Sequence, residues 1–486
     1  MCFKNIKFYF FQFYNIIVLF INIRKIVYNI NNIENEESHL IVGGLKKNIN
    51  SIGIFAIKLV QWVIEKLKLT SSDDKTLEIL DQFNNYYEDC PVHEYDFTKK
   101  IYFESFNDEI DNKYVIEKTP IASGSIGQVY KGYLKDNKNI KIAMKVVHPN
   151  IDRQLLIPRI LLKVYNNISY LFSLGFYIPL NFDDFFDYLN MQINLNYEKN
   201  NMEVHRENYK DNSFIVIPKV YESSKNILIM SYEDGTFFEN LQISNYQKSK
   251  ILTILRLYIR SSLVCNNIIH GDLHNGNWKV RKHPTIKNNY QIILYDLGLC
   301  AKLKNNSFMI RFYKYCDYDD KDKLSDLMIE ASKYKLNDAK KKFIKIKLLE
   351  LFNNLELNKR LIIKKILKKT IEVLTSNNVI IESVYFNIFC TAINTGNHIS
   401  KYCDLSSDYS VDIQKDCAFK EIYPSLIAFC DTYNCFNNYG DIMKSIMNND
   451  KKEYELFPDL KKKLKCGNMN NLLDIDSDLD SDSDVE

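Results

Sequence analysis

The chain has 486 residues, of which 46% are hydrophobic and 13% aromatic, a composition that favours a folded protein with a sizeable core over a disordered one. Its 64 Lys and Arg residues nearly balance 61 Asp and Glu residues, and a net charge of +3 without a basic stripe argues against nucleic acid binding. The 11 cysteines include no CxxC pair, which favours a reduced, intracellular compartment.

The chain begins with an apolar and aromatic run at residues 8–23, flanked on both sides by basic residues (Lys4, Lys7, Arg24 and Lys25). The run is short and interrupted by polar residues, whereas a membrane-spanning helix needs about 20 apolar residues. A targeting segment, a helix lying in the membrane interface and an apolar helix docked on the core remain open. We assign residues 1–45 to this targeting or membrane-associated segment.

Helical periodicity over residues 52–69 predicts an amphipathic helix, within an N-terminal helical extension that we place at residues 46–114. A β-rich unit is expected at residues 115–235 and a helical unit at 236–466, because apolar residues recur at helical spacing after residue 296. Residues 467–486 form an acidic, low-complexity tail that we expect to be disordered.

A candidate phosphate-binding loop has the sequence PIASGSIGQV at residues 120–129 and is followed by a predicted hairpin turn near 135–139 and the strand IAMKV. Lys145 in that strand is the candidate lysine for the α- and β-phosphates of a nucleotide. Only one glycine lies at the centre of the loop, so its geometry must differ from that of a glycine-rich loop. The candidate nucleotide-binding residues here are Ala122, Ser123, Gly124 and Ser125. An ordinary hairpin is the alternative.

A second cluster predicts phosphoryl-transfer chemistry. The sequence HGD at residues 270–272 is followed five residues later by Asn277 and then by the triplet DLG at 296–298. One carboxylate must orient the attacking hydroxyl or water, while an Asn and a second carboxylate hold magnesium. Asp272 is therefore the candidate base, and Asn277 and Asp296 are the candidate metal ligands. The alternative is a polar surface loop.

Together these motifs make the chain resemble the UbiB/aarF-domain-containing (ADCK) atypical kinase family. The loop IASGSIGQV, the strand IAMKV followed by HPN, the segment HGDLHNGN and the DLG triplet match the family's motifs, and the loop is closest to the branch that reads ASGS. The segment CPVHEYDFT at 90–98 and the helix NYEKNN at 196–201 resemble further family segments.

The chain also departs from the family pattern at two motifs. The KxGQ signature becomes Lys58-Leu-Val60-Gln61, which keeps two residues of implied regulatory role, Lys58 and Gln61. The ExD motif becomes Gln192-Ile-Asn194 and loses both carboxylates. Glu198 survives, and the resemblance makes it the candidate ion-pair partner of Lys145.

The resemblance implies an α+β, two-lobed protein-kinase-like fold with a β-rich small lobe, a helical large lobe and a family-specific N-terminal helical extension. Residues 229–235 would form the hinge that faces adenine, with Met230 and Tyr232 binding nucleotide. Implied ligands are ATP or ADP with Mg²⁺ and a membrane lipid or isoprenoid small molecule. Homodimerisation or a lipid-biosynthesis complex is left open.

The implied activity is that of an atypical kinase or ATPase acting on or supporting isoprenoid or quinone lipid metabolism at a membrane, in mitochondria by family resemblance. The intact Asp272, Asn277 and Asp296 set favours this reading. The lost ExD carboxylates and the altered KxGQ signature favour an alternative, a catalytically weak pseudokinase scaffold that uses nucleotide as a conformational switch.

Overall fold

The structure of the chain is a computed structural model. It describes residues 10–21, 35–70, 78–82, 92–160 and 182–402, with short gaps at 12, 20, 81, 152–153, 211, 265, 304–306, 318 and 356–361. The predicted acidic tail at 467–486 and the end of the predicted helical unit, residues 403–466, lie outside the described residues.

A six-stranded antiparallel sheet forms the small lobe, with the order β1-β3-β4-β7-β6 and with β2 paired to β3. Its longest strands form the predicted hairpin, which turns at Lys135 and Asp136. The strands are β1 Tyr114–Ile116, β2 Ala122–Ser123, β3 Gly127–Leu134, β4 Asn137–Val147, β6 Val220–Ser223 and β7 Ile227–Ser231.

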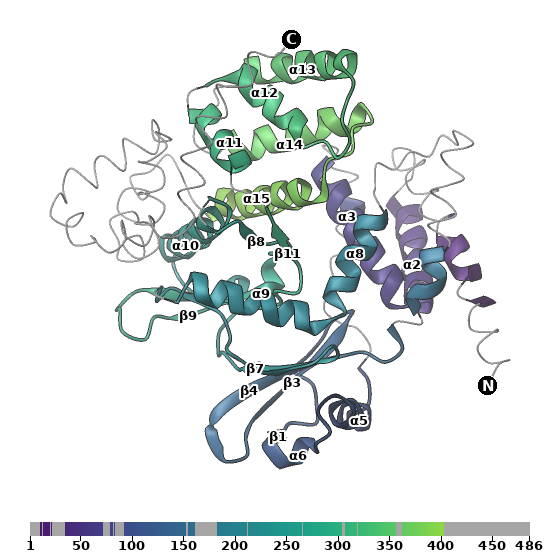
Figure 1. Cartoon of the computed structure of the whole chain (residues 1–486), viewed down its shortest axis with the longest axis vertical. Helices are drawn as coiled ribbons and strands as arrows, with labels where there is room; N and C mark the ends of the chain where they lie inside the picture. The colour runs from purple at the N-terminus through teal and green to yellow at the C-terminus, as the bar shows by residue number, and fades with distance from the viewer. Residues whose placement is uncertain are drawn as a thin grey trace, which may run out of the picture.

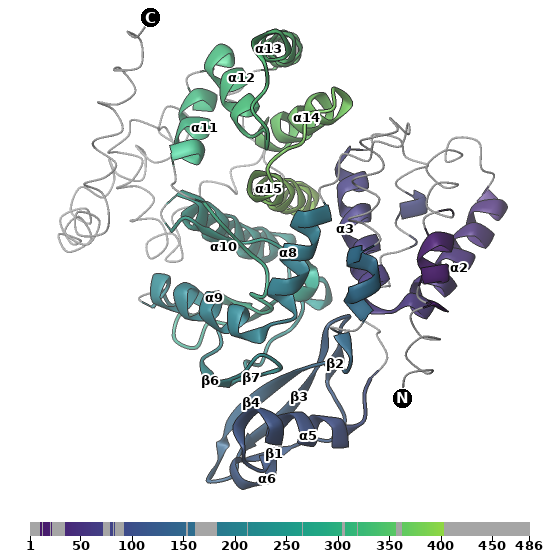
Figure 2. The ribbon, with the colours of Figure 1, turned by 45° about the vertical axis from the view of Figure 1, so that its right-hand side comes forward.

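The two faces of this sheet have different partners because side chains alternate along each strand. On the outer face, Tyr130 and Met144 join a buried cluster with Tyr102 of α5 (Tyr95–Phe106) and Ile110 of α6 (Ile110–Lys113). The inner face carries Lys145 and is covered by α9 (Leu195–Asn208). Figures 1 and 2 show α5 and α6 outside the sheet and α9 between the sheet and the helical lobe.

The large lobe contains two small sheets set among helices. Strand β10 (Tyr290–Leu294) pairs with β9 (Trp278–Lys282) and with β5 (Ile215–Val216), and β8 (Ile268–His270) pairs with β11 (Cys300–Lys302). Its helices are α10 Asn245–Val264, α11 Ser307–Asp317, α12 Lys321–Glu330, α13 Asp338–Asn353, α14 Ile362–Ser376 and α15 Ser383–Tyr402, with single 3₁₀ turns at η2 Phe238–Asn240 and η3 Asn275–Asn277.

An N-terminal helical layer packs beside both lobes. Helix α2 (Asn35–Ile52) is separated from α3 (Ile54–Thr70) at Gly53, and α3 packs against α8 (Phe182–Gln192), α14 and α15. The helix α3 is the amphipathic helix predicted at 52–69, and α2 crosses the boundary predicted at residue 45. Val60, which stands where the family has glycine, is 6% exposed and belongs to the main core.

Residues 10–21 are helical where described, and they are amphipathic. Ile16 and Leu19 are buried against the core, while apolar side chains on the other side are exposed (Phe10, Phe11, Phe13, Tyr14, Ile17 and Ile21). The side chain of Asn15 donates to Phe11 O at 3.0 Å, which satisfies this polar group inside the apolar run. Within the described part of the chain, no helix has the length and hydropathy to cross a membrane.

The small antiparallel lobe, the helical large lobe and the helical extension together give the α+β, two-lobed kinase-like fold that the sequence predicted. The strands carry β-branched and aromatic residues with alternating burial, and the large-lobe helices bury residues at helical spacing, such as Ile344, Leu348 and Phe352 of α13.

Candidate active site

Lys145 joins three segments that are far apart in the sequence. Its Nζ lies 2.7 Å from Glu198 Oε2 of α9 and 2.9 Å from Asp296 Oδ1 of the DLG triplet. The side chain of Lys145 reaches inward because it stands opposite Val129 in β3, on the face of the sheet that α9 covers. The ion pair predicted between Lys145 and Glu198 is formed, and Asp296 completes a triad.

Burial and charge shift the pKa values of this triad. Desolvation raises the pKa of Glu198 to about 7, although the ammonium of Lys145 opposes the shift. Desolvation acts the same way on Asp296, but Lys145 outweighs it and holds the pKa of Asp296 well below its usual range. The pKa of Lys145 is raised, because its two carboxylate partners outweigh its own desolvation. Lys145 and Asp296 are therefore fully charged at neutral pH.

The backbone of the DLG triplet is strained. Asp296 has φ of 49°, in the left-handed region that non-glycine residues seldom adopt. This conformation leaves the Asp296 side chain 48% exposed while one of its oxygens contacts Lys145. A Cβ at Gly298 would lie 3.2 Å from Asp296 Oδ1 and 3.5 Å from Glu198 Oε2, so any larger residue would crowd the triad.

The HGD segment is tied to the DLG triplet by a buried histidine. His270 Nε2 lies 3.0 Å from Tyr295 O, which can only accept, so Nε2 donates. Burial lowers the pKa of His270, which is therefore neutral, and its Nδ1 accepts from the Asp272 amide at 3.2 Å. One ring thus fixes the backbone ahead of Asp272 relative to the backbone ahead of Asp296.

Asn277 is oriented so that its amide oxygen can act as a ligand. Its side-chain Nδ2 donates to Asp272 O at 2.7 Å, and its backbone carbonyl accepts from the Tyr295 amide at 2.8 Å. Since the nitrogen of the side-chain amide is used, the oxygen is left for an external partner. The Asp272 carboxylate is 38% exposed and lies 4.0 Å from His274 Nε2.

The predicted nucleotide loop lies between β2 and β3. Ser123 and Ser125 are 8% and 5% exposed, while Ala122 is exposed. The Ser123 hydroxyl is buried without a hydrogen-bond partner among the described residues. Ser123 stands opposite Gln128 of β3, so its side chain lies on the face of the sheet away from Lys145. The turn is closed by a hydrogen bond of 3.0 Å from Gly124 N to Gly127 O.

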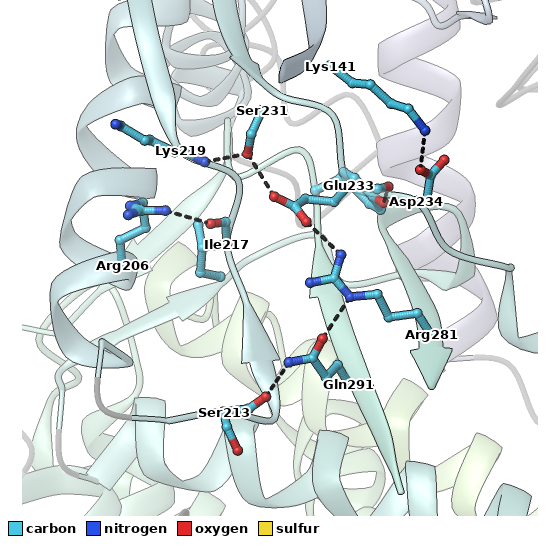
Figure 3. Close-up of polar contacts among 11 residues, drawn as sticks. Lys141, Arg206, Ser213, Ile217, Lys219, Ser231, Glu233, Asp234, Arg281 and Gln291 are labelled. Atoms are coloured by element: carbon cyan, nitrogen blue, oxygen red, sulfur yellow. Dashed lines mark hydrogen bonds and ion pairs between the residues drawn. The ribbon is translucent and has the colours of Figure 1, made fainter. Parts of the chain in front are cut away.

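The hinge follows β7. Met230 is buried on the inner face. The ammonium group of Lys131 lies over the ring of Tyr232, with Nζ 4.6 Å from the ring centroid. Glu233 accepts from Ser231 Oγ at 2.8 Å and from Arg281 at 2.7 Å. Figure 3 shows these contacts continuing from Arg281 through Gln291 to Ser213, which ties the hinge to the β9–β10 hairpin between Asn277 and Asp296.

The altered family motifs lie at the edge of the site. Desolvation raises the pKa of Asp296, and Lys145 lowers it more strongly. The positive charge of Lys58 in α3 lowers the same pKa by a smaller amount. Gln61, one turn further along α3, is half-buried. Asn194 caps α9, because its side chain accepts from the Asn196 amide at 3.2 Å. No ionised partner for Lys58 remains at positions 192 and 194.

Three residues that hold the site together were not singled out from the sequence. The side chain of Asn201 donates to Leu297 O at 2.8 Å and so fixes α9 to the DLG triplet. His270 and Tyr295 join the two polar loops. The only sequence signal for Asn201 was its place in the family-like NYEKNN helix. The hydrogen bond from His270 to Tyr295 O joins distant segments, so no local sequence pattern predicted it.

The residues present fit a magnesium ion shared with nucleotide phosphates. No group of three or more His, Cys, Asp or Glu side chains in the described ranges could hold a metal alone. Mg²⁺ is commonly held by one or two protein ligands while phosphates and water supply the rest. The exposed carboxylate of Asp296 and the available oxygen of Asn277 match that pattern.

This geometry, with a lysine paired to a helical glutamate and to a loop aspartate, defines a protein-kinase-like site. The sequence model of the ABC1 atypical kinase-like domain matches residues 86–326, which contain all of these groups except Lys58 and Gln61. The chain belongs, through this domain, to the UbiB/aarF-domain-containing atypical kinase family.

Individual relatives are distant. A probable serine/threonine-protein kinase of Dictyostelium discoideum is 29% identical over 261 residues, covering 51% of this chain and 36% of that protein. A mitochondrial ABC1 family protein of Saccharomyces cerevisiae is 26% identical over 281 residues, covering 52% of this chain and 42% of that protein. The chain thus matches well under half of the length of these relatives. Among solved structures, Rv3197 of Mycobacterium tuberculosis with erythromycin is 18% identical, with a TM-score of 0.43 over 54% of this chain and 67% of that one.

Proposed function

We propose that this chain is an atypical kinase or ATPase that binds Mg-ATP and acts on, or in support of, isoprenoid or quinone lipids at a membrane. The observation that supports it best is the triad in which Lys145 contacts both Glu198 and Asp296. A lysine held by a helical glutamate beside a metal-binding aspartate is the arrangement that phosphoryl transfer requires.

Each residue has a defined task in this proposal. Lys145 binds phosphate oxygens and is held in line by Glu198. Asp272 orients the hydroxyl or water that attacks and accepts its proton, and the neutral His270 keeps the backbone at Asp272 in register with Asp296. Asn277 and Asp296 would hold Mg²⁺, which supplies neutralisation of the charge that develops on the phosphates.

Two features support a small acceptor at a membrane. The helix α3 carries Lys58 close enough to Asp296 to act on its pKa, so this extension stands at the edge of the site rather than away from it. The exposed apolar side of residues 10–21, which includes Phe10 and Ile17, suits insertion into the interface of a bilayer, and basic residues flank the run in the sequence. The mitochondrial relative supports an organellar location.

Turnover of Mg-ATP by the purified chain tests the proposal, with and without liposomes and with isoprenoid head-group mimics as acceptors. Asp272→Asn should lower phosphate release by about 100-fold and leave nucleotide affinity within a few-fold, because the carboxylate acts mainly in the transition state. Asp111→Asn is the matched control, since Asp111 is 61% exposed and pairs with Lys99 on α5.

The scaffold alternative gives a different result in the same experiment. A chain that binds Mg-ATP but turns it over equally slowly with and without Asp272→Asn would be a nucleotide-binding scaffold. A chain that binds no nucleotide would refute both readings.

A further inference from the structure

A chain of polar side chains lies on the outer face of the small-lobe sheet and ends on the nucleotide loop. We call it the histidine chain; its members are Gln128, Tyr130, Thr98, His93 and His148. Thr98 is fully buried in α5, and Gln128 and Tyr130 are fully buried in β3. His93 belongs to the CPVHEYDFT segment, and His148 directly follows the strand that carries Lys145.

The last bond of the histidine chain has only one donor. His148 Nε2 lies 3.0 Å from Gly124 O, which can only accept, so Nε2 donates. Burial lowers the pKa of His148, and burial together with His148 lowers the pKa of His93 to about 4. Both rings are therefore neutral at neutral pH, and a neutral ring that donates through Nε2 must accept through Nδ1.

The remaining donors follow in order. Since His148 Nδ1 accepts, His93 Nδ1 donates to it across 2.9 Å, and His93 Nε2 accepts from the Thr98 hydroxyl at 3.0 Å. Thr98 Oγ1 in turn accepts from Tyr130 at 2.9 Å, and the Tyr130 oxygen accepts from the side-chain amide of Gln128. Gln128 is itself fixed to the backbone of His93 by two bonds of 2.9 and 3.0 Å. The bonds from the Gln128 amide through Tyr130, Thr98, His93 and His148 thus all donate in one direction, toward Gly124.

This direction decides which way one loop peptide faces. Val146 stands opposite Gln128 in the β3–β4 register and Lys145 opposite Val129, so Lys145 lies on the face away from the histidine chain. The C=O and N–H of a trans peptide point in opposite directions. Because His148 holds the Gly124 carbonyl on the outer side, the N–H of Ser125 points toward the side of Lys145. That N–H has no acceptor among the described residues.

On the basis of the proposed function, we propose that His148, held in its orientation by His93, is a positioning residue for the nucleotide. It fixes the Gly124–Ser125 peptide so that the Ser125 N–H donates to a phosphate oxygen next to Lys145. Gly124, whose carbonyl belongs to this peptide, is free in its backbone angles, so the peptide can flip by about 180° at little energetic cost. A loop with one glycine therefore needs an outside hydrogen bond to keep this N–H on the phosphate side.

Binding of Mg-ADP and Mg-ATP to the full chain, measured by titration calorimetry, tests this role with two variants at one position. His148→Leu removes the donor, and the Kd should rise about 5- to 10-fold, the usual effect of one hydrogen bond. His148→Gln keeps an N–H near the place of Nε2, and the Kd should stay within about threefold of wild type. The KM for ATP should rise with the Kd in His148→Leu and stay near the wild-type value in His148→Gln.

His283→Leu is the matched control for general loss of stability. His283 is also buried, at 8% exposed, and bonds to Ser213 Oγ at 2.9 Å in the large lobe, so its loss should lower the Tm without changing the Kd. Hydrogen exchange of the apo protein adds a second readout, in which His148→Leu, but not His148→Gln, should speed exchange in residues 122–128.

The outcomes separate this inference from the proposed function. The positioning role alone would be overturned if wild type and His148→Leu bound nucleotide with the same Kd. It would also be overturned if His148→Gln bound nucleotide as weakly as His148→Leu does. Wild type that binds neither Mg-ADP nor Mg-ATP would overturn the proposed function and, with it, the assignment of a phosphate to the Ser125 N–H.

Discussion

Lys145 is balanced by two carboxylates of different character. Glu198 is almost fully buried, and its Oε1 has no hydrogen-bond partner among the described residues, whereas Asp296 is half exposed. Because burial raises the pKa of Glu198 to about 7, Glu198 holds Lys145 through a hydrogen bond of 2.7 Å and carries its full charge only above neutral pH. Asp296 faces solvent and can exchange the lysine for a cation that arrives with the nucleotide.

The first prediction follows from that difference. Asp296→Asn removes the charge that a magnesium ion needs, so Mg²⁺-dependent thermal stabilisation by ATP or ADP should be lost. Thermal unfolding with nucleotide, with and without Mg²⁺, measures the effect. Asp319→Asn, which changes a surface aspartate paired with Lys321, should respond to Mg-ADP as wild type does. Equal stabilisation of wild type and Asp296→Asn would contradict the assignment of the metal ligand.

At the scale of elements, α9 connects the lobes through several contacts. Glu198 contacts the sheet through Lys145, Asn201 donates to the DLG triplet, and His205 lies 3.6 Å from Cys300 at the start of β11. These residues are three or four apart and therefore share one side of the helix. The surviving Glu198 thus belongs to a helix that fixes both Lys145 and the DLG triplet.

The helix at residues 10–21 leads to the second prediction. Its exposed side includes Phe10 at 74%, Tyr14 at 61% and Ile17 at 41%. Replacing these three with Ser should reduce flotation with liposomes that contain anionic lipid, because the inserted apolar area is lost. Residual binding should fall further at high salt, since the flanking basic residues remain.

The same three substitutions should not unfold the protein, because Ile16 and Leu19 still pack on the core. Circular dichroism and nucleotide affinity serve as controls. Unchanged flotation of the folded variant would show that residues 10–21 do not make the membrane contact.

The third prediction concerns α3. Lys58 lies at the edge of the site and Val60 is buried in the core, so the altered signature does not keep this helix away from the protein. In the proposed function this extension excludes an extended protein substrate. Radiolabelled ATP with a panel of acidic and basic proteins should therefore give no labelling of the panel. Strong labelling that is lost in Asp272→Asn would show that a protein can reach the site.

For the whole molecule, the sequence predicted the parts whose signals are local. The β3–β4 hairpin, the large-lobe helices and the order of Lys145, Asp272, Asn277 and Asp296 follow from periodicity and spacing. The left-handed backbone of Asp296, the bond from His270 to Tyr295 and the histidine chain could not be predicted, since each depends on tertiary contacts between distant segments. The boundary predicted at residue 45 falls within α2, because the helix continues through Gly43 and Gly44 without a break.

The lobes are joined by polar contacts as well as by the core. Tyr295, next to Asp296, donates its hydroxyl to Glu233 O at 2.7 Å, and Glu233 is bound to Arg281 of β9. The hinge is thus attached to the same hairpin that separates Asn277 from Asp296. These contacts join the hinge directly to the segments that carry Asn277 and Asp296.

Buried histidines contribute to the response of the fold to acid, and His205 gives the last prediction. Burial, with smaller effects from His270 and Lys302, lowers the pKa of His205 from 6.5 to about 3. Between these values the unfolded chain binds a proton that the folded chain does not, so the free energy of unfolding falls as the pH falls. One such group contributes a slope of about 1.4 kcal/mol per pH unit. His93, His148 and His270 are shifted in the same direction.

Urea unfolding of wild type and His205→Gln between pH 7.5 and 4.5 measures this contribution. Glutamine keeps polar atoms near Tyr258 and Cys300 but does not titrate. The variant should be less stable than wild type at pH 7.5, since the packing is imperfect, yet its stability should fall less steeply below pH 6, by about 1.4 kcal/mol per pH unit. Parallel curves for the two proteins would mean that His205 is protonated in the folded state, and the lowered pKa would be wrong.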